Sequence, residues 1–140
     1  MKDKKGLNNR ANKIYDARFI ANFIVDQNPN KVSNLMLQKI LYYVKIYFLV
    51  KCDRNIFSNS MEKWEYGPVI PDVYHEFNNY GSEPINAPQS LFVDEKDYTK
   101  GDRKVFGFYL HNYTKTDIEE DDQRPIEDIS KGILSRFRED

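Results

Sequence analysis

The sequence is poor in the residues from which disulfides, metal sites and phosphate-binding loops are made. Cys52 is the only cysteine among 140 residues, so no intramolecular disulfide can form and a secreted disulfide scaffold is excluded. The two histidines, His75 and His111, are not followed by a second ligand at helical spacing, so no zinc site is expected. The 6 glycines are scattered singly, which leaves no glycine-rich loop for a phosphate.

A catalytic constellation is also missing. We find no grouping of nucleophile, base and oxyanion donor, and a dyad of Cys52 with either histidine has no local support. The sequence therefore predicts a non-enzymatic protein that needs no cofactor and no metal.

Long apolar runs are absent as well. No segment approaches about 18 consecutive apolar residues, so none is predicted to span a membrane. Residues 1–13 are polar throughout and lack the apolar core of a signal peptide. The net charge of −1 argues against a dedicated nucleic-acid binder. These features predict a cytoplasmic protein with no membrane partner and disfavour a nucleic acid as its partner.

The chain is instead rich in aromatic residues. With 40% hydrophobic residues, 10 tyrosines and 9 phenylalanines, it is long enough for one domain with a real core. Charge is unevenly placed, because residues 1–13 are basic and residues 117–122 are acidic, and we interpret both as solvated. We expect a flexible basic arm over 1–13 and a single domain over 14–140.

Apolar periodicity predicts two helices in the first half of the domain. Residues 17–25 repeat at helical spacing, and the Asn-Pro-Asn at 28–30 ends that run. An N-cap at Ser33 or Asn34 predicts a second helix, reaching about Val50, that is central to the fold. Its expected apolar stripe consists of Leu37, Ile40, Leu41, Val44 and Phe48, with Gln38, Lys39 and Lys45 off the stripe.

A hairpin and a third helix are predicted next. Residues 56–57 are expected to pair with residues 62–66 as a short β-hairpin or extended arm, which Gly67-Pro68 breaks. Pro71 suits the first turn of a helix, where its missing amide costs nothing. That helix is expected to bury Val73, Tyr74, Phe77 and Tyr80 and to stop at Gly81.

The last third is predicted from weaker signals. Residues 82–100 are expected to be irregular, and Asp102 to cap a fourth helix reaching about Tyr113. The alternation of apolar residues at 106, 108 and 110 leaves a strand open there. Thr116 and Glu119 are spaced as a capping box, and a final helix is expected from Pro125. The predicted fold class is mainly α, with about five helices and the hairpin near residues 56–66.

Two side chains have a structural and a functional interpretation. Lys39 is expected to lie along the apolar stripe with its methylenes, or to make a cation–π contact with Trp64 or Tyr66. Trp64 is either a core anchor or an interface residue. For both residues we favour the structural interpretation.

The segments at 37–43 and 64–71 resemble the hallmarks of the Panacea domain of SocA-like antitoxins, which is also seen in phage-associated GepA-type proteins. The family has a Leu-Gln-Lys-Leu-Leu-Tyr helix, matched here with Ile40 in place of a leucine, and a Trp-x-Tyr-Gly-Pro-Val turn. The resemblance covers about residues 14–85 and fades over 86–140, where the family's Thr-His and Trp are missing. It implies a structural or partner-binding role for the motif residues Leu37, Gln38, Lys39, Leu41, Tyr42, Trp64, Tyr66, Gly67, Pro68, Val69 and Tyr74.

The resemblance also implies a function. It indicates a mainly helical domain that binds and neutralises a toxin encoded beside it, by occlusion or by delivering the toxin to a ClpXP-type protease. Two alternatives stay open: a phage or mobile-element protein that inhibits a host defence enzyme by binding, and a nucleic-acid-binding regulator that uses the basic arm.

Overall fold

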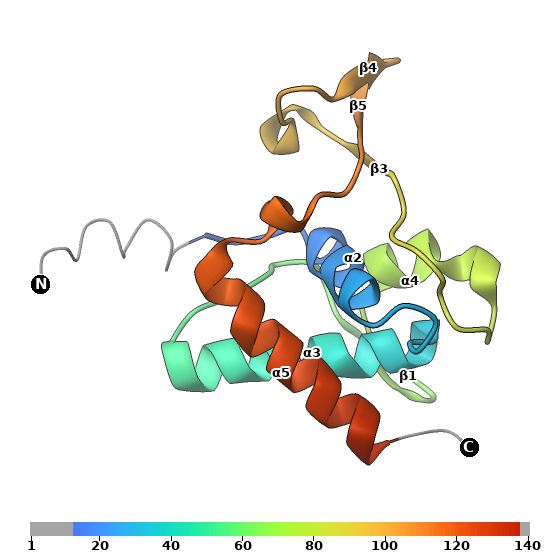
Figure 1. The fold of residues 1–140 in the computed structure, drawn as a ribbon, viewed down its shortest axis with the longest axis vertical. Coiled ribbons are helices and arrows are strands. Elements are labelled where there is room, and N and C mark those ends of the chain that lie inside the picture. The colour runs from blue at the N-terminus through green and yellow to red at the C-terminus, as the bar shows by residue number, and fades with distance from the viewer. Residues whose placement is uncertain (1–12, 138–140) are drawn as a thin grey trace, which may run out of the picture.

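A computed structural model describes residues 13–137 of the chain, so the predicted arm over 1–13 lies almost entirely outside the described residues. Within the described part, four α-helices are joined by two small antiparallel sheets and three short 3-10 turns. The helices α3 and α5 cross at one end of the molecule, and the β4–β5 hairpin projects at the other (Figure 1). The fold is broadly helical, but the prediction of a mainly α domain with five helices is wrong, because part of the last third forms a sheet.

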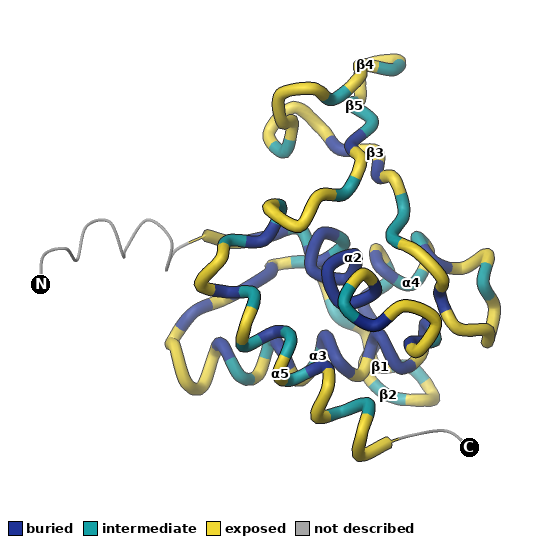
Figure 2. Tube along the Cα trace, viewed as in Figure 1, coloured by how far each residue is buried: buried dark blue, intermediate teal, exposed yellow. Residues whose placement is uncertain are grey.

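The first two predicted helices are confirmed. Helix α2 spans Ala17–Gln27, and the side chain of Asp16 caps it by accepting a hydrogen bond from the amide of Arg18. Helix α3 spans Asn34–Cys52, with Ser33 as its N-cap and Asp53 as a left-handed C-cap. All five residues of the predicted α3 stripe are buried. Helix α3 packs against α2, α4, α5 and β2, as expected of a central helix, whereas α2 is the more completely buried of the two, with all residues from Phe19 to Val25 inside (Figure 2).

The predicted hairpin forms, but its strands consist of other residues than expected. Strand β1 (Glu62–Trp64) pairs with β2 (Gly67–Val69), so the Gly-Pro pair belongs to the second strand and is not a break. Phe57 instead forms an isolated parallel bridge with Tyr15, whose amide donates to the carbonyl of Ile56 at 2.8 Å, and the ring of Phe57 is completely buried in the core. A two-residue turn is sufficient to close the β1–β2 ribbon, which brings the two halves of the Trp-x-Tyr-Gly-Pro-Val motif face to face.

Helix α4 (Pro71–Glu76) starts at the predicted proline but is shorter than expected. The chain continues after Phe77 as a 3-10 turn, η1 (Asn78–Tyr80), and Gly81 follows with a positive φ of 59°. Of the apolar residues expected inside, Val73 and Phe77 are fully buried, whereas Tyr74 and Tyr80 are only half-buried.

The prediction of a fourth helix from Asp102 to Tyr113 is wrong, and the strand alternative is correct. Residues 91–111 form a three-stranded sheet, which we call the β insert, with β3 (Leu91–Val93) and β4 (Arg103–Val105) on either side of β5 (Phe108–His111). The 3-10 turn η2 (Glu95–Asp97) lies between β3 and β4. The expectation of an irregular segment over 82–100 is thus wrong for β3, whose three residues are too few to reveal a period.

The final helix, α5, spans Glu120–Arg136 and begins before the predicted start at Pro125. Three acidic residues, Glu120, Asp121 and Asp122, occupy its first turn, where the helix dipole favours negative charge. The predicted capping box at Thr116 is displaced by two residues, because Thr114 and Asp117 form it around the 3-10 turn η3 (Lys115–Asp117). Among residues 13–137, no helix is long and apolar enough to cross a membrane.

Candidate protein-binding surface

A buried glutamine joins the two motif segments. The side-chain oxygen Oε1 of Gln38 accepts a hydrogen bond from the amide of Ile70 at 2.9 Å. Its Nε2 donates to Asn34 at 3.0 Å, and Asn34 in turn donates to the carbonyl of Tyr74 at 2.9 Å. Gln38 and Asn34 are both buried, so the prediction that Gln38 lies off the buried stripe is wrong. These bonds fix α3 against the start and the middle of α4.

Some motif residues belong to the core. Leu37 and Leu41 are fully buried, and Val69 is 2% exposed. Trp64 and Tyr74 are half-buried and pack edge to face, with ring centroids 5.1 Å apart. The indole nitrogen of Trp64 donates to Glu62 at 2.9 Å. These side chains stabilise the scaffold and leave little surface for a partner.

The remaining motif residues open onto one groove. This groove, which we call the motif groove, has a volume of about 320 Å³ and lies between α3 and the β1–β2 ribbon. Its motif lining consists of Gln38, Lys39 and Tyr42 from α3 and of Tyr66, Gly67, Pro68 and Val69 from the ribbon. Two motifs that are more than twenty residues apart in the sequence therefore share a single concave surface. Their role in binding remains a prediction.

The outward side of α3 is uncovered and apolar. Five large residues of this helix are exposed, and we call them the α3 face: Leu35, Tyr43, Ile46, Leu49 and Val50. Their spacing of three, four and seven residues places most of them along one side of the helix. Leu35 and Tyr43 also line the motif groove, so the groove and the α3 face form one continuous surface.

The charge of this surface has one sign along the helix. Helix α3 contains Lys39, Lys45 and Lys51 and no acidic residue. The ammonium of Lys39 lies 4.8 Å from the ring centre of Phe137, the C-cap residue of α5, so the cation–π alternative for Lys39 is realised with a ring other than Trp64 or Tyr66. An apolar face bordered by lysines is suited to a protein surface that is apolar with acidic edges.

Comparison with known proteins identifies the family. The family model described as "Antitoxin SocA-like, Panacea domain" matches residues 37–135, which include both motifs, most of the lining of the motif groove and most of α5. The chain belongs to this family. The protein Antitoxin SocA of Caulobacter vibrioides (strain NA1000 / CB15N) is 40% identical over 73 residues, which cover 50% of this chain and 39% of that protein. This chain thus matches well under half of that relative's length. No solved structure matches.

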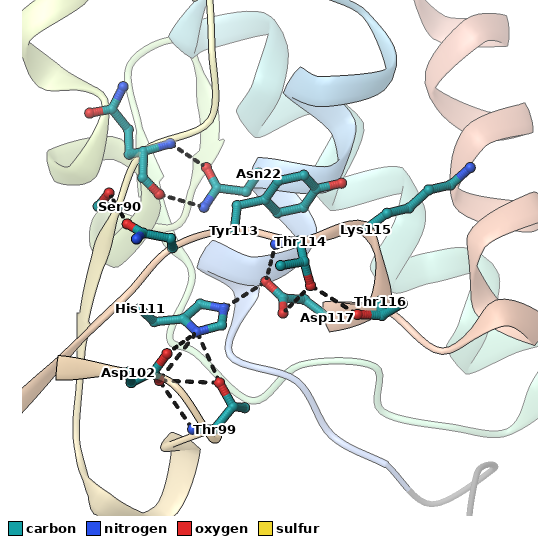
Figure 3. A network of polar contacts seen from close by, with 12 residues as sticks. Asn22, Ser90, Thr99, Asp102, His111, Tyr113, Thr114, Lys115, Thr116 and Asp117 are labelled. Carbon is teal, nitrogen blue, oxygen red and sulfur yellow. Dashed lines mark hydrogen bonds and ion pairs between the residues drawn. The ribbon is translucent and has the colours of Figure 1, made fainter.

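The Panacea domain of this chain also contains a buried histidine between two carboxylates. In His111, Nδ1 lies 3.0 Å from Asp102 and Nε2 lies 2.8 Å from Asp117 (Figure 3). The ring stacks on Phe19 of α2 at 5.2 Å. Burial lowers the pKa of His111, but the hydrogen bonds and charges of the two aspartates outweigh burial and raise it above its ordinary value of 6.5. The imidazolium form donates from both ring nitrogens.

This histidine fastens the β insert to the helices. Asp102 and His111 belong to the insert, Asp117 to η3, and Phe19 to α2. The amide side chain of Asn22 adds a second attachment, because it both donates to and accepts from the backbone of Gln89 at 2.9 Å. With both ring nitrogens hydrogen-bonded and 3% of the residue exposed, His111 holds the β insert on the helices.

A second buried charge cluster attaches α5. Arg54 donates to both oxygens of Asp122 at 2.7 and 2.9 Å, and the hydroxyl of Tyr15 donates to the same carboxylate at 2.7 Å. Burial and the neighbouring carboxylate of Asp122 raise the pKa of Tyr15 well above its ordinary value. The interpretation of residues 117–122 as a solvated acidic run is wrong for Asp117 and Asp122, which are nearly inaccessible.

Sequence reasoning missed the exposed apolar residues of the α3 face and the buried polar residues that hold the helices and the β insert together. Ile46 and Leu49 follow the same helical period as the core, and only the packing of α3 shows which side is covered. Both histidines were considered as metal ligands or as partners of Cys52 and not as buried structural groups, whereas His75 is exposed and His111 is buried. Among residues 13–137, no cluster of three or more potential ligands is placed to hold a metal ion. Cys52 is an exposed free thiol.

Proposed function

We propose that this chain is a non-enzymatic antitoxin that neutralises a protein toxin, encoded by a neighbouring gene, through direct binding. Membership of the SocA-like family supports the antitoxin role. The observation that carries the binding mode is the uncovered α3 face, which continues into the groove lined by both family motifs. We assign this combined surface as the toxin-binding site.

The physical reason lies in the cost of leaving such a surface in water. Scattered exposed apolar residues are normal, but contiguous apolar patches with a polar rim are typical of protein–protein interfaces. The aromatic rings of Tyr42, Tyr43 and Tyr66 supply large contact areas with few rotatable bonds, as interface hot spots do. Covering them with a partner releases ordered water and stabilises the complex.

The site supports stoichiometric binding and offers no arrangement for turnover. Three of the most buried titratable side chains, Tyr15, His111 and Asp122, are engaged in the scaffold and lie outside the motif groove. We further propose a cytoplasmic location and, following the resemblance to SocA-like antitoxins, either occlusion of the toxin or its transfer to a ClpXP-type protease. The competing roles, as an inhibitor of a host defence enzyme or as a nucleic-acid-binding regulator, have no separate support in residues 13–137.

Growth of cells that express the neighbouring gene tests this proposal. The neighbouring gene alone should arrest growth, and co-expression of the wild-type chain should restore it. The double variant Ile46→Asp/Leu49→Asp should fail to restore growth, because it places two charges within the apolar contact. Phe106→Asp is the matched control, since Phe106 is 98% exposed on the projecting hairpin at the opposite end of the molecule (Figure 1).

Two outcomes would reject the proposal. If the neighbouring gene is harmless alone, or stays toxic beside the wild-type chain, the antitoxin role is wrong. If the α3 double variant protects cells as well as the wild type does, at equal protein levels, the assigned surface is wrong.

A further inference from the structure

A second hollow adjoins the motif groove. It has a volume of about 600 Å³ and lies between the loops at residues 28–33 and 82–84 and the last turns of α5. Met36 lines both hollows, so this side chain forms the low wall between them. Leu134 and Phe137 contribute the apolar side of the second hollow.

The charged residues that line the two hollows are all lysines. Lys31 and Lys131 line the second hollow, and Lys39 lines the motif groove. No aspartate or glutamate lines either one, although the whole chain has 22 acidic and 21 basic side chains. All three lysines are exposed, and no ion pair forms between them and another residue of the range 13–137. A one-sided charge in a nearly neutral protein points to a ligand of the opposite sign.

We infer that the two hollows together bind an acidic segment of the toxin that carries apolar side chains at intervals. This inference rests on the proposed function and specifies the chemistry of the partner. The apolar side chains of the segment enter the hollows on either side of Met36, and its carboxylates face Lys31, Lys39 and Lys131. Charges at the rim of an apolar site mainly accelerate association and select the partner, while the apolar contacts slow dissociation.

A peptide fits this surface better than a nucleic acid does. Met36, Leu134 and Val69 line the hollows with aliphatic surface, which bases and phosphates do not use. Sites for single-stranded nucleic acid combine a basic groove with exposed rings on which successive bases stack. The rings here are separated by the Met36 wall, with Phe137 on one side and Tyr42 and Tyr66 on the other.

Charge reversal at the three lysines tests the inference on the full chain and the purified toxin. The triple variant Lys31→Glu/Lys39→Glu/Lys131→Glu should raise the Kd for the toxin about 10- to 100-fold and reduce its dependence on salt. The matched control is Lys96→Glu/Lys100→Glu/Lys104→Glu, which changes the net charge equally on the exposed part of the β insert. The control should leave the Kd within about threefold, because the β insert projects at the end of the molecule opposite to α3 and α5 (Figure 1), and salt screens exposed charges that are far apart.

Additional measurements distinguish a loss of toxin binding from misfolding and from the binding of another ligand. Lys131 also donates to Asn28 at 3.3 Å, so a set with Lys131→Gln in place of Lys131→Glu checks that a loss of affinity does not reflect misfolding, and thermal unfolding is followed for every variant. A 20-nucleotide single-stranded DNA is the second probe.

The possible results are distinct. If the wild type does not bind the toxin at all, the proposed function fails. If the wild type binds and both triple variants bind equally well, or both lose affinity equally, only the present inference fails. Binding of the DNA with an affinity equal to that for the toxin, lost on reversal of the three lysines, would show a general polyanion site and overturn the peptide assignment.

Discussion

The side-chain oxygen of Gln38 accepts a hydrogen bond from the backbone amide of Ile70 at 2.9 Å, and through this bond the two family motifs become one structural unit. The bond crosses 32 positions of sequence and is buried. It places the start of α4 against α3 and thereby sets the width of the motif groove, whose lining comes from the helix and from the ribbon that precedes α4.

Replacement of this glutamine tests its structural role. Gln38→Leu keeps the volume but leaves the buried amide of Ile70 without its acceptor, so the free energy of unfolding should fall by about 1–3 kcal/mol. Urea unfolding followed by circular dichroism measures this change. Gln27→Leu is the control, because within residues 13–137 the side chain of Gln27 donates one hydrogen bond, to the exposed neighbour Asp26 at 3.5 Å, and its effect should stay within about 0.5 kcal/mol. An equal loss of unfolding free energy in both variants would contradict the structural role of Gln38.

The histidine between two aspartates predicts a pH-dependent stability. Because the pKa of His111 is raised in the folded state, its contribution is fully present below the unfolded value of about 6.5 and is lost as pH rises through the folded pKa. The unfolding free energy of the wild type should therefore decline above neutral pH relative to that of His111→Gln. Urea unfolding of both proteins across this range measures the difference, and a difference that does not vary with pH would contradict the assignment of a charged imidazolium.

Removal of the buried carboxylate of Asp122 should greatly lower the free energy of unfolding. Asp122→Ala leaves the buried guanidinium of Arg54 without its bidentate partner, which should cost about 3–5 kcal/mol of stability. Asp128→Ala removes the exposed ion pair with Arg124, and its effect should be below about 0.5 kcal/mol. Thermal and urea unfolding of the two variants provide the comparison. Similar values for both would mean that the Arg54–Asp122 pair adds nothing beyond a surface pair.

A substitution in the turn at the tip of the β insert should stabilise the protein. Phe106 and Gly107 form the two-residue turn between β4 and β5 with φ values of 49° and 86°, a conformation in which asparagine–glycine is favoured. Phe106→Asn should therefore raise stability by about 0.5–1 kcal/mol, since the fully exposed ring makes no contact that is lost. Gly107→Ala should lower stability by about 1 kcal/mol, because a Cβ is strained at this φ. Denaturant unfolding measures both changes. If Phe106→Asn lowers the free energy of unfolding, the ring of Phe106 stabilises the turn and the prediction is wrong.

How far the sequence could predict this fold depended on the length of each element. Helices α2 and α3 carry several turns of apolar repeat with a recognisable cap, and both were predicted close to their observed bounds. The strands β3 and β4 have three residues each, and their alternation is indistinguishable from a fragment of a helical pattern. The start of α5 was placed too late because Pro125 is normally a first-turn residue, whereas here it lies within the helix.

The candidate site could be predicted only in part. The motif resemblance correctly identified the family, and the structure gathers Lys39, Tyr42 and Tyr66 around one groove. Gln38 was misplaced because polarity alone suggested exposure, and the amide of Ile70 that buries it comes from a distant segment. The burial of Asp117 and Asp122 was missed for the same reason, since their partners, His111 and Arg54, are not their sequence neighbours.

The most direct test of the central claim is the dissociation constant between the purified chain and the product of the neighbouring gene, which is the toxin in the proposed function, measured by isothermal titration calorimetry. We predict one-to-one binding by the wild type and by Phe106→Asp with similar Kd. The variant Ile46→Asp/Leu49→Asp should bind at least about 100-fold more weakly, which corresponds to about 2.7 kcal/mol. A double variant that is folded and binds the toxin as tightly as the wild type would contradict the assignment of the α3 face as the site of neutralisation.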